Sequence, residues 1–380
     1  MGNVKLREVI KRANTKVDKD NTNLIYYVGG EHIESENIRV HKYGLIAGST
    51  IGPMFYYGFK AGDFLLVSRN PHLKKAGLVD FDGICSEKTF VLETVDPTIL
   101  LPEFLPFVLQ NKRFWDYAYQ HRHGSTNTFI NWSTLSDYEF ELPDLETQRK
   151  LAAVLWSIND TMESYKKLIS ATDELVKSQF MEQFGGPGSQ SRYPTVALGS
   201  ISNMISGGTP SSKHPEYFGG NIPFVSTPCL GPNFIDTSAA HNWLTELGVQ
   251  MSSTHIVPAY SLMVGNRVGV GKSSINTCEM CTNQDILSFV DIDTDKYDLI
   301  FIKKVIEQYG PIFESQKRSA TIKGVPSDLV KASQIPQAPI EVQRAFVAFV
   351  RQSDKSKFEL EQALAELTAT YKRIIAENLG

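Results

Sequence analysis

Two short stretches contain residue types that could hold a phosphate group or a metal ion. The stretch RVGVGKSS covers residues 267–274, but a phosphate-cradling loop also needs a glycine five positions before Gly271, where the chain has Asn266. Cys278 and Cys281 form a CxxC pair, whereas a structural zinc site usually has four ligands. The glycines therefore predict a tight turn between strands, and the cysteines predict small buried side chains.

No catalytic constellation follows from the other reactive side chains. The eight histidines are scattered, and His121 and His123 flank Arg122 without a Ser/His/Asp grouping. NPHL at residues 70–73 departs in its last two residues from the Asn-Pro-Pro-aromatic corner that amino-methyltransferases use on a flipped base. The sequence therefore favours a binding or scaffolding protein over an enzyme, with no catalytic residue, metal or cofactor of its own.

Polar, basic loops that contain glycine are the remaining candidate binding elements. HRHGSTNTFIN covers residues 121–131, SGGTPSSKHPEYFGG covers 206–220, and QKRSATIKGVPSDL covers 316–329. Hydroxyl, amide, lysine and arginine side chains on such loops suit contacts with the phosphates and base edges of DNA. The same composition is also typical of solvated turns, so each loop keeps both interpretations.

An internal repeat indicates how the chain positions these loops. ETQRKLAAVL at residues 146–155 returns as EVQRAFVAFV at 341–350, and both copies continue in register to a glycine, at Gly185 and Gly380. Upstream, FLLVSR meets SLMVGNR and ICS meets MCT. The offset between matches changes slightly, as loop insertions in two homologous domains would make it do. The chain is therefore predicted to repeat one plan, a variable domain followed by a long helix.

Apolar residues in both repeated segments recur at helical spacing, with charged residues between them. At about 1.5 Å rise per residue, each helix would be about 60 Å long. We expect the two helices to form an antiparallel coiled coil, because each must carry its domain to the opposite end. Two separate helices, each lying on its own domain, are the alternative. The predicted helix-pairing residues are Leu151, Leu155, Ile158, Met162, Ile169, Val176, Phe180, Phe346, Phe349, Leu360, Leu364, Leu367 and Tyr371.

The predicted fold class is α+β, with two mixed α/β domains separated by two long helices and related by a pseudo-twofold internal repeat. Short β-rich runs such as 64–67 and 89–92 alternate with turns, and helices are expected at 101–111 and 298–309. The expected divisions are a first domain at 1–144, a first spacer helix at 145–184, a linker at 185–194, a second domain at 195–339 and a second spacer helix at 340–380.

Charge and apolar content limit the classes of partner. The net charge is −4, from 38 basic and 42 acidic side chains, and no segment is a basic block. DNA binding would therefore need local patches, or a partner that supplies much of the phosphate attraction. Apolar runs are too short to span a bilayer, the first residues predict no signal peptide, and four cysteines do not indicate a disulfide framework. We expect a cytoplasmic protein without a membrane partner.

The layout resembles the DNA specificity subunit of type I restriction–modification systems over the whole chain. The strongest likeness is the pair of openings LPDLETQR and IPQAPIEVQR. In that family, a proline-rich step into a Leu-Glu-x-Gln helix ends a target recognition domain. IYYVGGEHIESENIR at 25–39 and GGTPSSKHPEYFGGNIPFV at 207–225 also resemble segments of those domains. The second opening departs slightly, with Gln337 and Ala338 inserted.

This resemblance implies a non-catalytic subunit. Each target recognition domain would read one half of a split, asymmetric target on double-stranded DNA. The helices, which correspond to the central and C-terminal conserved regions of the family, would hold the halves apart. Two modification (methyltransferase) subunits carrying S-adenosylmethionine would dock on the helices, and restriction subunits would join that core. Exposed helix residues such as Arg149, Lys166 and Arg344 are expected to meet the modification subunits.

Candidate DNA contacts come from loop chemistry, because recognition residues vary within the family. A coiled-coil scaffold that joins two partners without DNA binding is the main alternative, and the near-neutral charge of every segment favours it slightly. The candidate DNA-binding residues are Arg69, Arg122, Ser125, Thr126 and Asn127 in the first domain, and Thr209, Ser211, Lys213, Arg267, Lys272, Lys317, Arg318 and Lys323 in the second.

Overall fold

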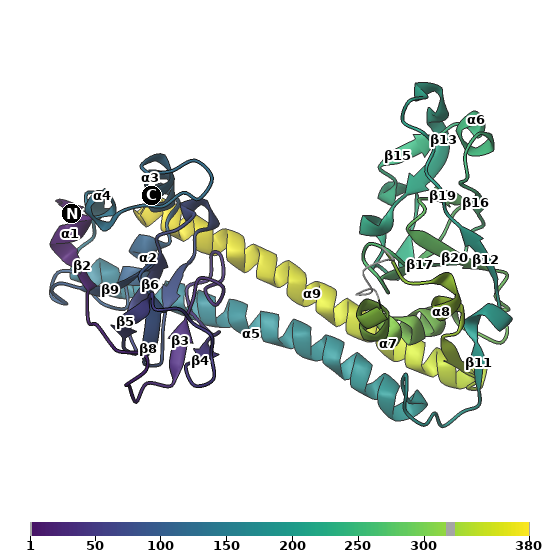
Figure 1. Cartoon of the computed structure of the whole chain (residues 1–380), viewed down its shortest axis with the longest axis horizontal. Coiled ribbons are helices and arrows are strands. Elements are labelled where there is room, and N and C mark those ends of the chain that lie inside the picture. The colour runs from purple at the N-terminus through teal and green to yellow at the C-terminus, as the bar shows by residue number, and fades with distance from the viewer. Residues whose placement is uncertain (1, 317–323, 380) are drawn as a thin grey trace. The chain divides into compact units, whose positions relative to one another are not determined.

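The computed structural model describes residues 2–316 and 324–379, and the chain divides into two compact units. Unit 1 combines Met1–Lys166 with Glu361–Gly380, and unit 2 is Lys167–Leu360. Both units are mixed α/β, as the sequence predicts, and each long helix contributes one part to each unit (Figure 1).

Unit 1 contains, in its described residues, two four-stranded sheets and one strand pair. The first sheet has the order β2-β9-β6-β7, over Ile10–Ala13, Thr89–Thr94, Phe64–Val67 and Ala76–Leu78. The second has the order β4-β3-β8-β5, over Gly44–Leu45, Tyr26–Val28, Gly83–Ser86 and Phe55–Phe59. β1 (Gly2–Lys5) pairs with β10 (Glu139–Leu142). The short helices are α1 (Leu6–Val9), α2 (Leu105–Leu109), α3 (Lys112–Gln120) and α4 (Trp132–Leu135).

Unit 2 repeats this plan in its described residues, with one strand added to a sheet edge. Its larger sheet has the order β12-β20-β17-β18-β14, over Asn203–Ser206, Ile286–Val290, Leu262–Gly265, Ser273–Asn276 and Phe234–Ile235. The other has the order β15-β13-β19-β16, over Asn242–Leu244, Phe218–Val225, Met280–Thr282 and Ile256–Val257. β11 (Thr195–Ala197) pairs with β21 (Gln334–Pro336). The helices are α6 (Glu246–Gln250), α7 (Leu299–Gln316) and α8 (Ser327–Lys331).

Strand for strand, the two units correspond. Sheet β2-β9-β6-β7 matches β12-β20-β17-β18, and sheet β4-β3-β8-β5 matches β15-β13-β19-β16. Cys85 on β8 and Cys281 on β19 occupy the same place, each between a parallel and an antiparallel neighbour, and both are buried. The repeat predicted from the helix openings therefore extends through both domains.

The central strands are apolar on both faces because each face enters a different core. On β6, Phe64 and Leu66 join the core that packs against the long helices, and Leu65 and Val67 join a second core. On β17, Leu262 and Val264 join the helix-side core, and Met263 joins the other. Successive side chains of a strand point to opposite faces, so a continuous apolar run fits a strand that is covered on both sides.

The long helices are α5 (Leu145–Phe184) and α9 (Ile340–Leu379), and within each unit they run antiparallel. In unit 1, the start of α5 meets the end of α9, where Thr368 Oγ1 lies 3.5 Å from Met162 Sδ. In unit 2, the order is reversed, and Phe184 lies 5.4 Å from Phe346 between ring centroids. Lys357 of α9 also pairs with Asp173 of α5 at 2.8 Å.

Every predicted helix-pairing residue is buried or half-buried, and some of them also belong to the domain cores. Leu155 lies in the unit 1 core, and Phe180 and Phe346 lie in the unit 2 core. The helix ends therefore stabilise the domains as well as each other. Leu155, Met162, Phe180 and Phe346 are buried, and Leu151, Ile158, Ile169, Val176, Phe349, Leu360, Leu364, Leu367 and Tyr371 are half-buried.

A buried glutamine fastens the start of each long helix to its domain. Gln148 donates through Nε2 to the carbonyls of Ile99 and Pro143, and its Oε1 accepts from the Leu101 amide. Gln343 makes the same three bonds, to the carbonyls of Lys296 and Ala338 and from the Asp298 amide. The glutamine shared by ETQR and EVQR is therefore a clamp between the helix and the preceding domain.

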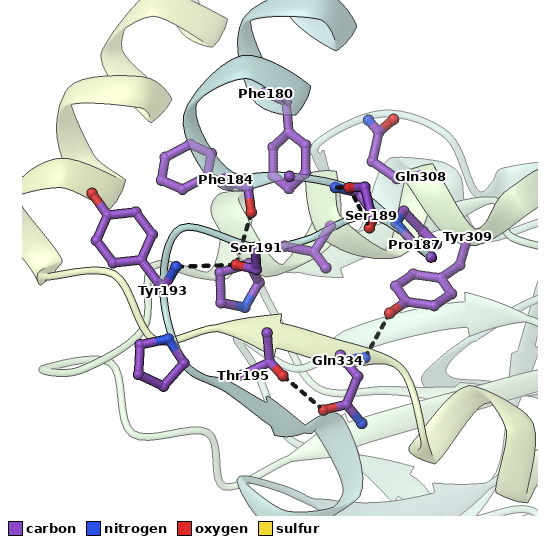
Figure 2. Close-up of a pocket in the computed structure, with 16 residues that line it drawn as sticks. Phe180, Phe184, Pro187, Ser189, Ser191, Tyr193, Thr195, Gln308, Tyr309 and Gln334 are labelled. Carbon is purple, nitrogen blue, oxygen red and sulfur yellow. Dashed lines mark hydrogen bonds between the residues drawn. The ribbon is translucent and has the colours of Figure 1, made fainter.

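The glycine-rich segment after α5 folds back on unit 2 through a small set of hydrogen bonds. Ser191 Oγ donates to the Phe184 carbonyl at 2.9 Å and accepts from the Tyr193 amide at 3.2 Å (Figure 2). Gly185, with φ of 76°, adopts the left-handed conformation that glycine accepts readily just past a helix. The hydroxyl of Tyr309 accepts from the Gln334 amide nearby. The turn thus joins the end of α5 to β11.

Candidate nucleic-acid interface

Loop 121–131 of unit 1 presents most of the first domain's candidate residues to solvent. Ser125, Thr126 and Asn127 are exposed. Arg122 lies over the ring of Tyr119, with 3.7 Å between guanidinium carbon and ring centroid, and donates to the Tyr119 carbonyl at 2.6 Å. This arrangement holds one cation beside three uncharged polar side chains, which suits contacts with DNA.

Arg69 lies at the base of the same loop, although it follows β6 in the sequence. The amide of Asn70 donates to the Thr128 carbonyl, and the amide of Ile130 donates to the Ser68 carbonyl. The Arg69 guanidinium lies 5.8 Å from the ring centroid of Phe129. The fold therefore brings Arg69 and loop 121–131 together, as a DNA-contact surface requires.

A pocket of about 250 Å³ opens beside Arg69. Most of its polar residues are not among the candidates predicted from the sequence. Ser68 and Arg69 line it from the end of β6, and the other lining residues include Arg12, Glu87, Lys88, Asn131 and Trp132. Arg12 looks unremarkable in the sequence, because only strand pairing across β2, β9 and β6 brings it near Arg69. The alternation of strand side chains is the one signal that could have separated it from Lys11.

Arg267 is the unit 2 counterpart of Arg69. In unit 1, Ser68 donates to the Lys88 carbonyl; in unit 2, Asn266 donates to the Asp285 carbonyl. Ser68 then accepts from Ile130, as Asn266 accepts from Val325. Arg267 is half-exposed and lies 3.9 Å from a carboxylate oxygen of Asp285. The two domains thus hold an arginine at one equivalent place with different neighbours.

The turn between β17 and β18 agrees with the sequence interpretation. Gly269 and Gly271 have φ of 58° and 78°, in the left-handed region that glycine favours, and Lys272 is exposed beside them. Gly271 faces Gly310 of α7, and a Cβ there would lie 2.9 Å from the Gly310 Cα. The glycines serve this turn and this close approach, which accounts for the sequence RVGVGKSS without a bound phosphate.

Loop 206–220 contributes exposed polar groups to unit 2. Thr209 donates through its hydroxyl to Gln284, the residue before Asp285, so Thr209 borders the Arg267 site. Ser211 and Lys213 are exposed and interact with each other, the Ser211 hydroxyl accepting from the Lys213 amide at 3.4 Å. Thr209 and Arg267 therefore contact two adjacent residues, Gln284 and Asp285. Lys317, Arg318 and Lys323 lie outside the described residues.

The cysteines are poor metal ligands in this fold. Burial raises the pKa of the Cys85 thiol to about 12, and burial also raises the pKa of Cys281 and Cys278. Metals bind the thiolate form. The described parts of the chain hold no group of three or more His, Cys, Asp or Glu side chains that could bind a metal ion. Within the same residues, no helix has both the length and the apolar character needed to cross a membrane.

Comparison with known proteins finds matches to one family. A sequence model described as "Type I restriction modification DNA specificity domain" matches residues 191–368. The strand-for-strand repeat extends the same domain plan to residues N-terminal to that match. Residues 191–368 therefore carry a type I restriction–modification DNA specificity domain, and the chain is similar to specificity subunits of that family. Specificity subunits of this family recognise DNA and are non-catalytic, and the similarity to them disfavours the scaffold alternative.

Individual members and their structures agree with this assignment. The HindI specificity subunit of Haemophilus influenzae is 21% identical over 319 residues, which cover 64% of this chain and 69% of that protein. A chain from a study of complex assembly in the type I R-M system aligns with a TM-score of 0.59 at 19% identity, covering 99% of this chain and 96% of that one. The S subunit of M. genitalium aligns with a TM-score of 0.59 at 14% identity, covering 100% and 96%. These two structures share the family's fold over the whole chain.

Proposed function

We propose that this chain reads double-stranded DNA for a type I restriction–modification complex, with one half of a bipartite target assigned to each domain. Residues 1–144 and 195–339 are the two target recognition domains. One observation carries the proposal: the same scaffold is built twice, and equivalent sites place Arg69 and Arg267 among different side chains. Equal scaffolds with unequal sites suit the reading of two different half-sites.

In this account, the long helices act as spacer and docking elements. Two modification subunits, which carry S-adenosylmethionine, dock on α5 and α9, and restriction subunits join that core. Arg149, Lys166 and Arg344 are exposed on the helices and are available for such contacts. The partner subunits supply much of the phosphate attraction, which a chain of net charge −4 cannot supply by itself. The complex acts in the cytoplasm.

Selection from a randomised duplex library tests this function. The full chain is co-expressed with a modification subunit, the complex is purified, and the bound duplexes are sequenced. The expected result is two short specific blocks separated by an unspecified spacer of constant length. Capture of two proteins without any sequence preference would support the scaffold alternative and contradict DNA reading. A single continuous block would contradict the bipartite target.

A further inference from the structure

The pocket beside Arg69 contains two arginines that are held by aromatic rings instead of by carboxylates. The Arg12 guanidinium lies 4.8 Å from the ring centroid of Tyr57 and 4.9 Å from that of Phe90. Arg69 lies over Phe129. Cation–π contacts of this kind fix a guanidinium and leave its N–H donors available. Both arginines are therefore positioned without being neutralised.

Arg12 carries a polar atom that has no partner in the described chain. Its Nε is buried and donates no hydrogen bond to any described residue. A buried donor without an acceptor destabilises the folded state, because it has lost its hydrogen bonds to water and gained none in return. A ligand that brings an acceptor into the pocket would remove this cost, so Arg12 Nε indicates an oxygen-bearing occupant.

The charges around the pocket favour an anion. Lys88 forms an ion pair with Glu87, and this contact holds the pKa of Glu87 below its usual value. Glu87 is thus ionised at neutral pH and balances Lys88. Glu87 also interacts electrostatically with Arg69. With Arg12, Arg69 and Lys88 against Glu87, the lining still carries an excess of positive charge around a volume of about 250 Å³. Arginine presents several donors in a planar fork, which matches the oxygens of a phosphate.

The equivalent place in unit 2 lacks this arrangement. Arg12 pairs with Leu92 on β9, and its counterpart by strand register is Met204, which pairs with Phe289 on β20. Lys88 is replaced there by Asp285, which lies beside Arg267. The paired arginines are therefore particular to unit 1, although both units share the scaffold.

We propose that this pocket, the arginine pocket, binds one phosphate of the DNA backbone through Arg12 and Arg69. The inference rests on the proposed function. It adds a difference between the two domains, because unit 2 lacks the paired arginines at the equivalent place. The arginine pocket anchors the first domain to the backbone, and the exposed loop 121–131 beside it reads bases. Phosphate contacts fix the position of a protein on a duplex but carry no sequence information, so the pocket contributes affinity and register.

Arg12→Met provides the test, because it installs the side chain type that unit 2 has at Met204. Binding of the full chain with its modification subunits is measured by fluorescence anisotropy over a salt series, on a selected target and on an unrelated duplex. We expect affinity to fall about tenfold on both duplexes, and the slope of log affinity against log salt to fall by about one. Lys11→Met is the matched control, since Lys11 is exposed on the opposite face of the same strand, and it should change neither quantity.

Neutral methylphosphonate linkages locate the contact. One position in the target should weaken wild-type binding and have no further effect on Arg12→Met. Arg69→Met should act in the same direction, and it replaces Arg12→Met if that variant melts at a lower temperature than the wild type. Loss of preference at one base with an unchanged salt slope would overturn the phosphate assignment in favour of base reading.

Two further outcomes separate the alternatives. If inorganic phosphate at matched ionic strength raises the melting temperature of the wild type but not of Arg12→Met, and DNA affinity is equal in both, the pocket binds a free anion and the DNA assignment is wrong. If the wild type binds its selected target and Arg12→Met and Arg69→Met both behave identically to it, only the arginine pocket fails. Absence of any sequence preference in the wild type would instead reject the proposed function.

Discussion

The two domains share one scaffold and differ at the site that the scaffold supports. In unit 1, Arg12 and Arg69 face a pocket and have no carboxylate partner among the described residues. In unit 2, Arg267 lies beside Asp285, and Thr209 donates a hydrogen bond to the adjacent residue Gln284. The buried strands and the glutamine clamps are equivalent in both. The comparison indicates that packing constrains the buried positions, whereas the exposed and half-exposed positions are free to differ between the domains.

A second difference lies beneath the long helices. Helix α2 of unit 1 is entirely apolar and buried, whereas α7 of unit 2 buries Lys303, which forms an ion pair with Glu307. Lys304 also contacts Glu307 at 2.9 Å. Burial opposes the ionisation of Glu307, but the two lysines outweigh it and lower the pKa of this carboxyl. The stability of unit 2 therefore depends on a buried ion pair on α7, whereas α2 of unit 1 has only apolar side chains.

Insertion of one heptad into both long helices, after Lys166 and after Leu360, should have the largest effect on DNA binding. It tests whether each domain recognises its own half-site independently of the distance between the half-sites. Seven residues add about 10 Å of helix, or about three base pairs at 3.4 Å per pair. Binding to the original target should weaken by about two orders of magnitude, because one half-site is lost. Library selection should recover the same two half-sites with a spacer about three base pairs longer. Altered half-sites would refute the spacer role.

Glu307→Gln should have the next largest effect, and it should act on unit 2 alone. The substitution leaves Lys303 buried with less compensation, which costs about 3 kcal/mol of unfolding free energy. Urea unfolding measures the loss, and Lys303→Met combined with Glu307→Gln should restore most of it.

Acid should act through the same group. The folded pKa of Glu307 is lowered, so its contribution is complete above the unfolded value near 4.5 and is lost as pH falls through the folded value. Glu307→Gln should flatten that part of the stability profile. An unchanged acid profile would show that the ion pair contributes nothing to the difference between the units.

Gln148→Ala and Gln343→Ala test the equivalence of the two clamps. Each removes three hydrogen bonds and leaves a backbone amide, of Leu101 or of Asp298, without its acceptor, so each should lower the unfolding free energy by about 2 kcal/mol. Thermal unfolding should show similar losses for both variants. Arg149→Ala is the control, since Arg149 is exposed next to Gln148 and should change little. Clearly unequal losses of unfolding free energy would contradict the equivalence of the Gln148 and Gln343 clamps.

Asp285→Asn should give the smallest effect and make the second site more similar to the first. Removing the carboxylate beside Arg267 lowers repulsion toward phosphate, so all duplexes should bind about threefold more tightly. Anisotropy at low and moderate salt measures the change. Asp295→Asn, which neutralises an exposed carboxylate on another loop, should leave affinity unaltered. Weaker binding by Asp285→Asn would show that this carboxylate itself contacts the DNA.

The sequence predicted the elements whose patterns are local, and it failed where contacts are distant. The helix openings and the turn at Gly269 and Gly271 follow from periodicity and glycine chemistry. The expected helix at 101–111 is shorter than predicted, since only α2 at Leu105–Leu109 is helical there, and Asn111 begins a separate helix, α3, by accepting from the Phe114 amide. The expected helix at 298–309 continues through Pro311 to Gln316, where buried Phe313 stacks on Tyr309.

Site residues show the same limit. Arg69 and loop 121–131 are chemically conspicuous, and the fold places them together. Arg12 is conspicuous only after β2, β9 and β6 are paired, and Gln148 reads as an ordinary helix residue until its partners near residue 100 are known. Strand register and long-range hydrogen bonds are tertiary information, which no local pattern contains.

Library selection on site variants tests the central claim, that one scaffold carries two independent readers. The wild-type complex, Asn127→Ala and Arg267→Ala are each selected against the same randomised duplexes. The account predicts that Asn127→Ala, in the exposed loop 121–131, weakens or relaxes one half of the motif, that Arg267→Ala does so to the other half, and that the spacer stays constant. A variant that alters both halves, or two variants that alter the same half, would contradict it.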